Sequence, residues 1–402
     1  MSPTTSLPSY SQYKAAFEGQ AKPFAFLDLD NLDANIAQVL QRSNPKNIRI
    51  GTKSVRCRQV IDRILGSSKR YQGLLTYCAA ESIWLAEMGY KDIVIAYPVV
   101  DKSYIDVICK TNKQMDAPIT CMIDSIEHIE LLNRIAEKND TVLPICLDID
   151  MSIRYPFLHF GVWRSPLHTA RDVEKILTAI KKNPLLRLDG IMGYEAQIAG
   201  VGDALSNQSI RNKIIHRLKN DAKPKIAHRR ETAIKIIQDA GLTLRFVNAG
   251  GTGSLEWSAE ETWVSEVTAG SAFYAPHLFD NYSHFKHLPA AGFALEIVRR
   301  PKKNIFTCQS GGYIASGSTG KEKQPVPYLP KKCRLLAAEG AGEVQTPIEY
   351  NGKQILQIGD PIFMRHSKAG ELCEHFNELI LVKNKALAGK YLTYRGEGKC
   401  FG

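Results

Sequence analysis

Eight short apolar runs between residues 48 and 270 alternate with longer segments whose apolar residues recur at helical spacing. Such alternation predicts a parallel sheet covered by helices. Eight strand–helix units are the number found in a (β/α)8 barrel, or TIM barrel. An open doubly wound sheet is the alternative, because periodicity predicts the number of strands and not the closure of the sheet. The expected strands are 48–52, 73–77, 92–96, 119–123, 142–148, 186–193, 244–248 and 263–268.

The sequence changes character on both sides of these units. Residues 24–29 read as a strand, followed by a helix that Asp30 or Asn31 could cap. After about residue 290, strand-like runs are separated by turns rich in Gly and Pro, which predicts a second, mostly β domain. These runs are 293–298, 355–358, 361–364 and 378–382. We expect an N-terminal segment (1–29) that packs on the β domain, the barrel (30–288) and the C-terminal β domain (289–402).

The charge and cysteine content exclude several classes of protein. The net charge is +11, but the 52 Lys and Arg residues are dispersed rather than gathered in runs with interleaved aromatics, so we expect no nucleic-acid partner. Nine cysteines without a CxxC pair argue against a disulfide framework or a zinc ribbon. The chain has neither an apolar stretch of membrane-spanning length nor a secretory signal pattern, so we expect a cytoplasmic protein without a membrane partner.

Lys53 directly follows the first expected strand of the barrel. Active sites of these barrels lie where the strands end, so a reactive residue at such a position is a candidate for catalysis. Most lysines are simply solvated at a surface. A desolvated amine at a barrel mouth, in contrast, has a lowered pKa and can form an imine with a carbonyl group.

Two Gly- and Ser-containing turns follow the last two expected strands and are candidates for binding a phosphate. Glycine lets backbone N–H groups approach a phosphate closely, and the neighbouring hydroxyl groups can donate to it. Barrels often hold phosphate after their late strands. An ordinary flexible turn is the alternative for each. The residues concerned are Gly251, Thr252, Gly253 and Ser254 in the first turn and Ser271 to Tyr274 in the second.

Three further residues at strand ends could contact a flat or anionic ligand. Tyr194 and Gln197 follow the sixth strand and place an aromatic ring and an amide there. Arg154 follows the fifth strand and could bind a phenolate or a carboxylate oxygen. A packed tyrosine at a helix start and a surface ion pair are the structural alternatives.

The stretch 365–375 of the expected β domain is dense in His, Glu and Cys, the residue types that bind divalent metals. Its spacing does not match a zinc-finger pattern, and a polar loop would have the same composition. His366, Glu371 and Cys373 are the candidate ligands.

The order of these motifs resembles one family, the fold-type III enzymes that use pyridoxal phosphate (PLP). The motifs are Lys53 after the first strand, Gly-Tyr-x-x-Gln after the sixth, Gly-Gly-Thr-Gly-Ser after the seventh and Glu-x-x-x-Gly-Ser after the eighth. Within the family the sequence is similar to the branch with D-threonine aldolase and D-serine dehydratase, including bacterial proteins called amino acid deaminase/aldolase. The resemblance covers nearly the whole chain.

The resemblance implies a barrel like the N-terminal domain of alanine racemase and a role for each motif. Lys53 would carry PLP as a Schiff base and then act as the base beside Cα, and Tyr194 would contact the ring. Arg154 would lie near the phenolic oxygen, but its spacing from Asp150 is one residue shorter than usual, which makes Arg164 a rival. The remaining cofactor contacts would be Gln197, Gly251, Thr252, Gly253, Ser254, Ser271 and Tyr274.

The expected metal site departs from the family. Relatives carry a His-x-Cys or His-x-Asp pair where this chain reads Glu371-Leu372-Cys373, so Glu371 would stand in for the histidine. With His366 or a water, these residues could hold Zn, Mn or Mg, or the altered ligand could mean that no metal binds.

The resulting prediction is a PLP-dependent lyase, an aldolase or a dehydratase, acting on D-configured β-hydroxy amino acids. In this fold type the second domain of one subunit closes the active site of another, so the resemblance also implies a homodimer. The alternatives are a PLP-dependent racemase, a noncatalytic protein that buffers PLP, and a barrel enzyme that binds a phosphorylated metabolite without PLP. The additional β domain argues against the noncatalytic protein.

Overall fold

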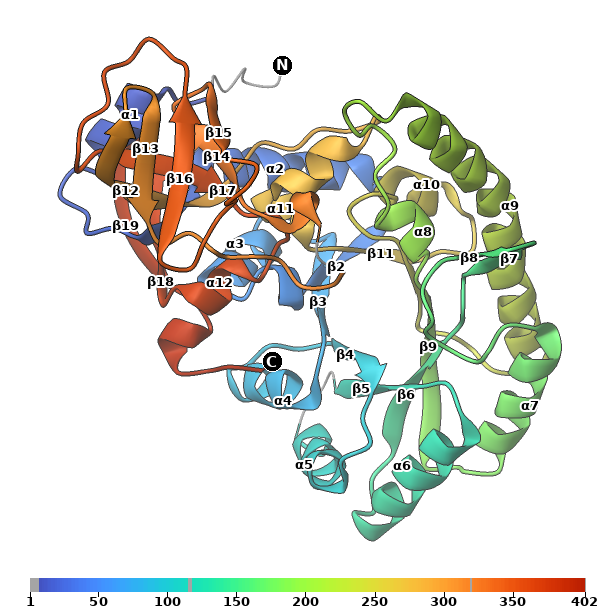
Figure 1. The fold of residues 1–402 in the computed structure, drawn as a ribbon. Coiled ribbons are helices and arrows are strands. Elements are labelled where there is room, and N and C mark those ends of the chain that lie inside the picture. Colours follow the sequence, from blue (N-terminus) through green and yellow to red (C-terminus); the bar gives the residue numbers. More distant parts are fainter. Residues whose placement is uncertain (1–6, 115–117, 319, 402) are drawn as a thin grey trace.

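The computed structural model describes residues 7–114, 118–318 and 320–401. Its centre is a closed barrel of eight parallel strands, which confirms the predicted TIM barrel and rules out the open sheet (Figure 1). The barrel closes where the last strand pairs with the first, with Ala269 opposite Ile50. The barrel strands are β2 (Asn47–Gly51), β3 (Tyr71–Thr76), β4 (Ile93–Pro98), β5 (Ile119–Ile123), β6 (Leu143–Asp148), β9 (Leu186–Gly193), β10 (Phe246–Ala249) and β11 (Glu266–Ala269).

Amphipathic helices surround the barrel. In α7, for example, Val173, Ile176, Leu177 and Ile180 recur at helical spacing and are all buried. The helix that precedes the barrel, α2, packs beside α10 and α11 and completes the ring. Among the described residues, no helix is both long enough and apolar enough to cross a membrane. The helices are α2 (Leu29–Arg42), α3 (Arg58–Leu65), α4 (Ala79–Glu87), α5 (Lys102–Asn112), α6 (Ile126–Lys138), α7 (Ala170–Lys181), α8 (Ala196–Ala199), α9 (Ser209–Asp239), α10 (Leu255–Glu260) and α11 (Ser271–Tyr274).

The interior of the barrel is a packed core that contains one fully buried cation. The guanidinium of Arg49 is bound by Glu266, with Nε 2.7 Å from Oε1, and by Asp92, with Nη2 3.0 Å from Oδ2. A buried charge needs such partners, since an unpaired one costs several kcal/mol. The side chains packed together inside the barrel are Val94, Ala96, Met122, Cys146, Met192 and Phe246.

A nine-stranded sheet forms the second part of the molecule, and the N-terminal residues belong to it. Strand β1 (Phe24–Asp28) lies between β12 (Ala291–Lys302), which runs antiparallel to it, and β18 (Glu378–Lys383), which runs parallel. Helix α1 (Tyr10–Ala16) covers this sheet near the N-terminus, in blue beside the orange strands of Figure 1. The other strands are β13 (Ile305–Gln309), β14 (Val326–Leu329), β15 (Cys333–Leu335), β16 (Gln345–Tyr350), β17 (Pro361–Arg365) and β19 (Ala386–Leu392).

Two local predictions are wrong. Residues 355–358 form no strand, and the strand that pairs with β13 is β16. Ile355 and Ile358 lie in an exposed segment before Gly359, and their apolar side chains are not buried against a sheet. The cap of α2 is Asp28 rather than Asp30 or Asn31, because the Asp28 carboxylate accepts the Asn31 backbone N–H at 3.0 Å.

Candidate active site

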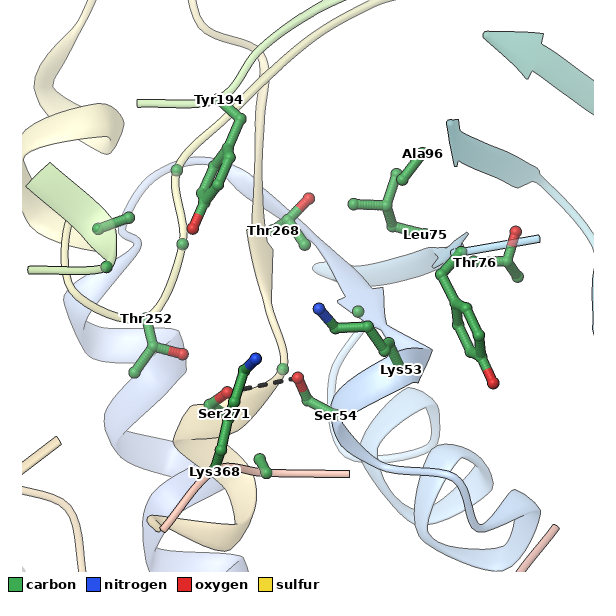
Figure 2. Close-up of a pocket in the computed structure, with 18 of the residues that line it drawn as sticks. Lys53, Ser54, Leu75, Thr76, Ala96, Tyr194, Thr252, Thr268, Ser271 and Lys368 are labelled. Carbon is green, nitrogen blue, oxygen red and sulfur yellow. Dashed lines mark hydrogen bonds between the residues drawn. The ribbon is translucent and has the colours of Figure 1, made fainter. Parts of the chain in front are cut away.

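Lys53 lies at the mouth of the barrel, in a single 3-10 turn (Thr52–Ser54) that directly follows β2. It lines a cavity of about 340 Å³ at the carboxyl ends of the barrel strands. Figure 2 shows its amine pointing into this cavity. The position is the one in which barrel enzymes place their reactive groups.

The surroundings of Lys53 favour the neutral amine. Desolvation of the Lys53 amine at the barrel mouth lowers its pKa, and the positive charges of Arg56 and Arg164 lower the pKa further. The negative charge of Glu371 acts in the opposite direction. Arg56 also holds the turn, because its Nε donates to the Lys53 carbonyl at 3.0 Å. A lysine that deprotonates more readily is a better nucleophile toward a carbonyl carbon and a better base.

The hydroxyl groups of Ser54, Thr252 and Ser271 line the same cavity and come from separate loops. Ser54 and Ser271 place their hydroxyl oxygens 3.3 Å apart, and Thr252 accepts the backbone N–H of Ala272 at 3.0 Å. Gly251 brings the backbone of the loop close, since a Cβ there would lie 2.9 Å from the Cβ of Ala199. These donors could bind the oxygens of a phosphate.

Ser254 supports this loop from behind rather than lining the cavity. Its hydroxyl donates to Oε1 of Glu195 at 2.7 Å, and the hydroxyl of Ser258 donates to the same oxygen at 2.6 Å. The other oxygen of Glu195 pairs with Arg230 at 3.2 Å, and both side chains are fully buried. Gly253 lies beside Ser254 in a separate depression. This network fixes the loop that carries Gly251 and Thr252.

Three other predicted contacts also lie outside the cavity lining. The amide of Gln197 donates to the Met151 carbonyl at 2.6 Å, and the hydroxyl of Tyr274 donates to the Val55 carbonyl at 2.9 Å. Arg154 is exposed on the short strand β7 (Ile153–Tyr155), which pairs with β8 (Leu158–Phe160). Gln197 and Tyr274 therefore form hydrogen bonds within the protein, and Arg154 lies at the surface.

Arg164, the rival of Arg154, does line the cavity. Its Nε donates to Asp148 Oδ2 at 2.6 Å, and its Nη2 donates to the Ala96 carbonyl, also at 2.6 Å. Burial alone would lower the pKa of Arg164, but Asp148 and Tyr97 raise it above its usual value. The guanidinium also lies over the ring of Tyr97, 4.8 Å from its centroid. It is thus a fixed, permanently charged group at the cavity wall.

Tyr194 follows β9 and lines the cavity, as its predicted role requires. Asn248 and Thr268, at the ends of β10 and β11, line it too and hydrogen-bond to each other at 2.9 Å. Asn248, Thr268 and Ser54 were not predicted from the sequence, although their places at strand ends could have indicated them. Lys323 and Lys368 were not predicted either, because they come from beyond the barrel and carry no such signal.

The candidate metal ligands do not converge. The Glu371 carboxylate accepts the backbone N–H of Ser316 at 3.1 Å, and the Cys373 thiol donates to the Val55 carbonyl at 3.4 Å. His366 is buried at a third place, directly after β17, and its ring nitrogens have no hydrogen-bond partner among the described residues. Within residues 7–114, 118–318 and 320–401, no three His, Cys, Asp or Glu side chains are placed to hold a metal. The predicted metal site is thus not assembled there.

Comparison with known proteins places this geometry in a family. Residues 27–277, more than half of the chain, match the family described as alanine racemase, N-terminal domain. A 3-hydroxy-D-aspartate aldolase of Paracoccus denitrificans (strain Pd 1222) is 26% identical over 254 residues, which span 62% of this chain and 59% of that enzyme. The match therefore covers less than two thirds of this curated relative.

Solved structures share the fold over nearly the whole chain. D-threonine aldolase from Filomicrobium marinum superposes with a TM-score of 0.78 at 15% identity, over 95% of this chain and 96% of that one. D-threo-3-hydroxyaspartate dehydratase from Delftia sp. HT23 gives a TM-score of 0.73 at 15% identity, over 93% and 98% of the two chains. The family match and the shared barrel confirm the predicted resemblance, and the chain belongs to the family of the alanine racemase N-terminal domain, the fold-type III PLP enzymes.

Proposed function

We propose that the protein is a PLP-dependent lyase that cleaves or dehydrates D-configured β-hydroxy amino acids, with Lys53 as the residue that holds the cofactor. The observation that carries this proposal is the Lys53 amine, with its lowered pKa, facing a cavity that also contains a cradle of hydroxyl groups. The names of the Paracoccus, Filomicrobium and Delftia enzymes support the choice of substrate class.

The residues present fit PLP. Among the described residues, none of the side chains that line the cavity is a carboxylate that would repel an anionic phosphate. Thr252, Ser271 and Ser54 offer hydroxyl groups to the phosphate, and the absence of a side chain at Gly251 leaves room for it. Tyr194 offers a ring against which a flat cofactor can pack. The volume of about 340 Å³ lies within the usual range for small-molecule sites.

The residues present do not fit a divalent metal, because Glu371, Cys373 and His366 each face a different neighbour in the described part of the chain. A carboxylate, a thiol and an imidazole bind one ion only when their donor atoms converge. We therefore assign the reaction to the cavity residues and give none of these three a catalytic role.

Lys53, Thr252, Ser271 and Arg164 would each have a separate role in the reaction. When bound, PLP withdraws electrons from Cα of the attached amino acid and weakens the bonds at that atom. Lys53 Nζ can take a proton from Cα in dehydration or from the β-hydroxyl in aldol cleavage. Thr252 and Ser271 would hold the phosphate, and Arg164, fixed by Asp148, would face the phenolic oxygen. Arg164 takes this part in place of Arg154, because Arg164 lines the cavity.

Product analysis with paired isomers tests the proposal. Purified enzyme incubated with D-threonine and D-serine should release glycine plus acetaldehyde, or keto acid plus ammonia, and the L-isomers should stay intact. Lys53→Ala should abolish release, whereas Lys102→Ala, an exposed lysine at the start of α5, should not. Racemised amino acid as the only product would overturn the lyase, and turnover of any amino acid would exclude a noncatalytic protein.

Racemisation is the second candidate, and one observation favours it. Reprotonation of Cα on the face opposite to Lys53 needs a second acid, and the amine of Lys368 also points into the cavity (Figure 2). Exchange of the Cα proton with solvent deuterium, with inversion and without carbon–carbon cleavage or ammonia release, would favour this function.

The structure also bears on the oligomeric state of the protein and on its compartment in the cell. We infer a homodimer. The large apolar side chains of Phe157 and Trp163 support it, because both are exposed around the hairpin β7–β8. Sedimentation of the holoenzyme at twice the mass of one chain would support this, and a stable monomer would contradict it.

All nine cysteines are unpaired, which supports a reducing compartment such as the cytoplasm.

A further inference from the structure

Two lysines of the second domain reach into the cavity at the barrel mouth. Lys368 follows β17, and Lys323 ends a short 3-10 turn (Lys321–Lys323). Both line the cavity, both are half-buried, and Figure 2 shows the Lys368 amine pointing inward. They lie beyond residues 27–277, so the family match does not account for them.

The cavity has an excess of positive charge. Within the part of the chain that the structure describes, its lining contains four cationic side chains, those of Lys53, Arg164, Lys323 and Lys368, and no Asp or Glu. Arg164 is compensated by Asp148 at 2.6 Å, and Lys53 is assigned to the cofactor. Two ammonium groups therefore have no role in the proposed function.

Among the described residues, no carboxylate forms an ion pair with either ammonium group. The Lys368 ammonium donates to the hydroxyl of Ser316 at 3.0 Å, a neutral partner. Among the described residues, neither Lys323 nor Lys368 has a carboxylate oxygen within the 4.0 Å of an ion pair. Glu371 lies near Lys368 and offsets part of its charge, but the Glu371 oxygens accept the backbone N–H of Ser316 at 3.1 and 3.2 Å and form no ion pair with Lys368. Half-buried cations that form no ion pair can bind an anionic ligand without breaking an existing ion pair.

The phosphate of the cofactor does not need these lysines. Thr252, Ser271 and Ser54 already supply neutral donors to it from the barrel loops. The anions left to bind are those of the substrate. An amino acid with a carboxylate on its side chain carries two such groups, one for each lysine, whereas threonine carries one.

We propose that Lys323 and Lys368 bind the two carboxylates of a dicarboxylic β-hydroxy amino acid and thereby select it over D-threonine. This inference rests on the proposed function and deepens it by naming the substrate class. The two substrates differ at one place, where D-3-hydroxyaspartate has a carboxylate and D-threonine a methyl group. With D-threonine one ammonium would stay uncompensated, so the lysines should raise kcat/KM for the dicarboxylate.

The test compares kcat/KM for D-3-hydroxyaspartate and D-threonine in the holoenzyme and in Lys323→Met and Lys368→Met. The variant that lacks the lysine at the side-chain carboxylate should lower the ratio of the two values by at least about tenfold, the effect of one lost charge pair. The variant that lacks the lysine at the α-carboxylate, which both substrates carry, should lower the two values alike. Lys368→Arg should restore most of the kcat/KM for D-3-hydroxyaspartate that Lys368→Met loses. Lys321→Met is the matched control, because Lys321 lies on the same turn but is exposed and does not line the cavity. An unchanged ratio in both variants would overturn the inference, whatever the absolute rates.

A binding measurement separates this inference from the proposed function. D-aspartate and D-alanine lack the β-hydroxyl group, so their binding to the holoenzyme is followed by thermal shift without a lyase reaction. D-aspartate should bind more tightly than D-alanine, and the variant that lacks the lysine at the side-chain carboxylate should remove the difference. That result would support the subsite even if no lyase activity were found. Equal binding of the two, or a loss of PLP affinity in the variants with substrate selectivity unchanged, would contradict it.

Discussion

Gly370, in the second domain, packs directly against the backbone carbonyl of Lys53. Its φ is +90°, and an added Cβ would overlap the Lys53 carbonyl oxygen and lie 3.2 Å from the Ser54 Cα. The turn that carries the reactive lysine is therefore held between the barrel and the other domain. Any side chain at Gly370 must displace this turn.

Gly370→Ala should therefore damage both stability and cofactor attachment. Gly359 is the matched control, with a φ of +91° and open space around the added Cβ. Gly359→Ala should cost about 1–2 kcal/mol in unfolding free energy from backbone strain alone. Gly370→Ala should cost at least about 2 kcal/mol more and should lower the visible absorbance of the holoenzyme. Equal unfolding curves in urea for the two variants would refute the contact.

Replacement of Ser271 should lower PLP affinity, whereas replacement of Ser254 should lower the stability of the fold. Ser271→Ala removes a cavity hydroxyl whose described partner is Ser54, so PLP affinity should fall about tenfold with little change in stability. Ser254→Ala removes a donor from buried Glu195 and should cost about 1–3 kcal/mol of stability. PLP titration and urea unfolding of both variants distinguish the two roles. The reverse pattern would show that the phosphate lies elsewhere.

Arg164 and Arg154 offer a direct comparison. Arg164→Met should reduce turnover by about a hundredfold or more, since a fixed charge is lost at the cavity. It should also destabilise the fold, because Asp148 is left buried without its partner. Arg154→Met, at an exposed position, should change neither. The double variant Arg164→Met/Asp148→Asn should regain stability but not activity, and recovery of activity would show that Arg164 is only structural.

Glu81 predicts a pH dependence of stability. It is buried in α4, accepts the Tyr77 backbone N–H at 3.0 Å, and burial raises its pKa from 4.5 to about 7. Between these values the folded protein binds the proton more tightly than the unfolded chain, so this residue lowers stability as pH rises from 4.5 to 7. Glu81→Gln should therefore gain about 3 kcal/mol of unfolding free energy relative to wild type between pH 4.5 and pH 8. Parallel stability curves for the two proteins would contradict it.

The barrel was predictable because each strand is a local apolar run and the helices repeat with their own period. The strands β5 and β9 have the bounds that the sequence predicts. The second domain was harder to predict, since its order depends on distant pairs, such as β1 between β12 and β18. Apolar content alone therefore marked 355–358 as a strand and missed β16.

The candidate site was predictable where it follows barrel strands, as for Lys53, Tyr194, Thr252 and Ser271. Ser254 and Gln197 sit at equally suggestive places in the sequence, yet their side chains turn into the protein to satisfy Glu195 and the Met151 carbonyl. Which way a loop side chain turns depends on buried partners far away in the chain. Lys323 and Lys368 depend on how the second domain packs, which no local pattern encodes.

The attachment of PLP to Lys53 is the central claim, and reduction of the holoenzyme with borohydride tests it most directly. The visible absorbance should disappear, and peptide mass analysis should find the reduced cofactor on the peptide that contains Lys53. Lys53→Ala should show neither signal, while the control Lys102→Ala should show both. A colourless protein that borohydride does not change, or a cofactor recovered on another lysine, would contradict the account.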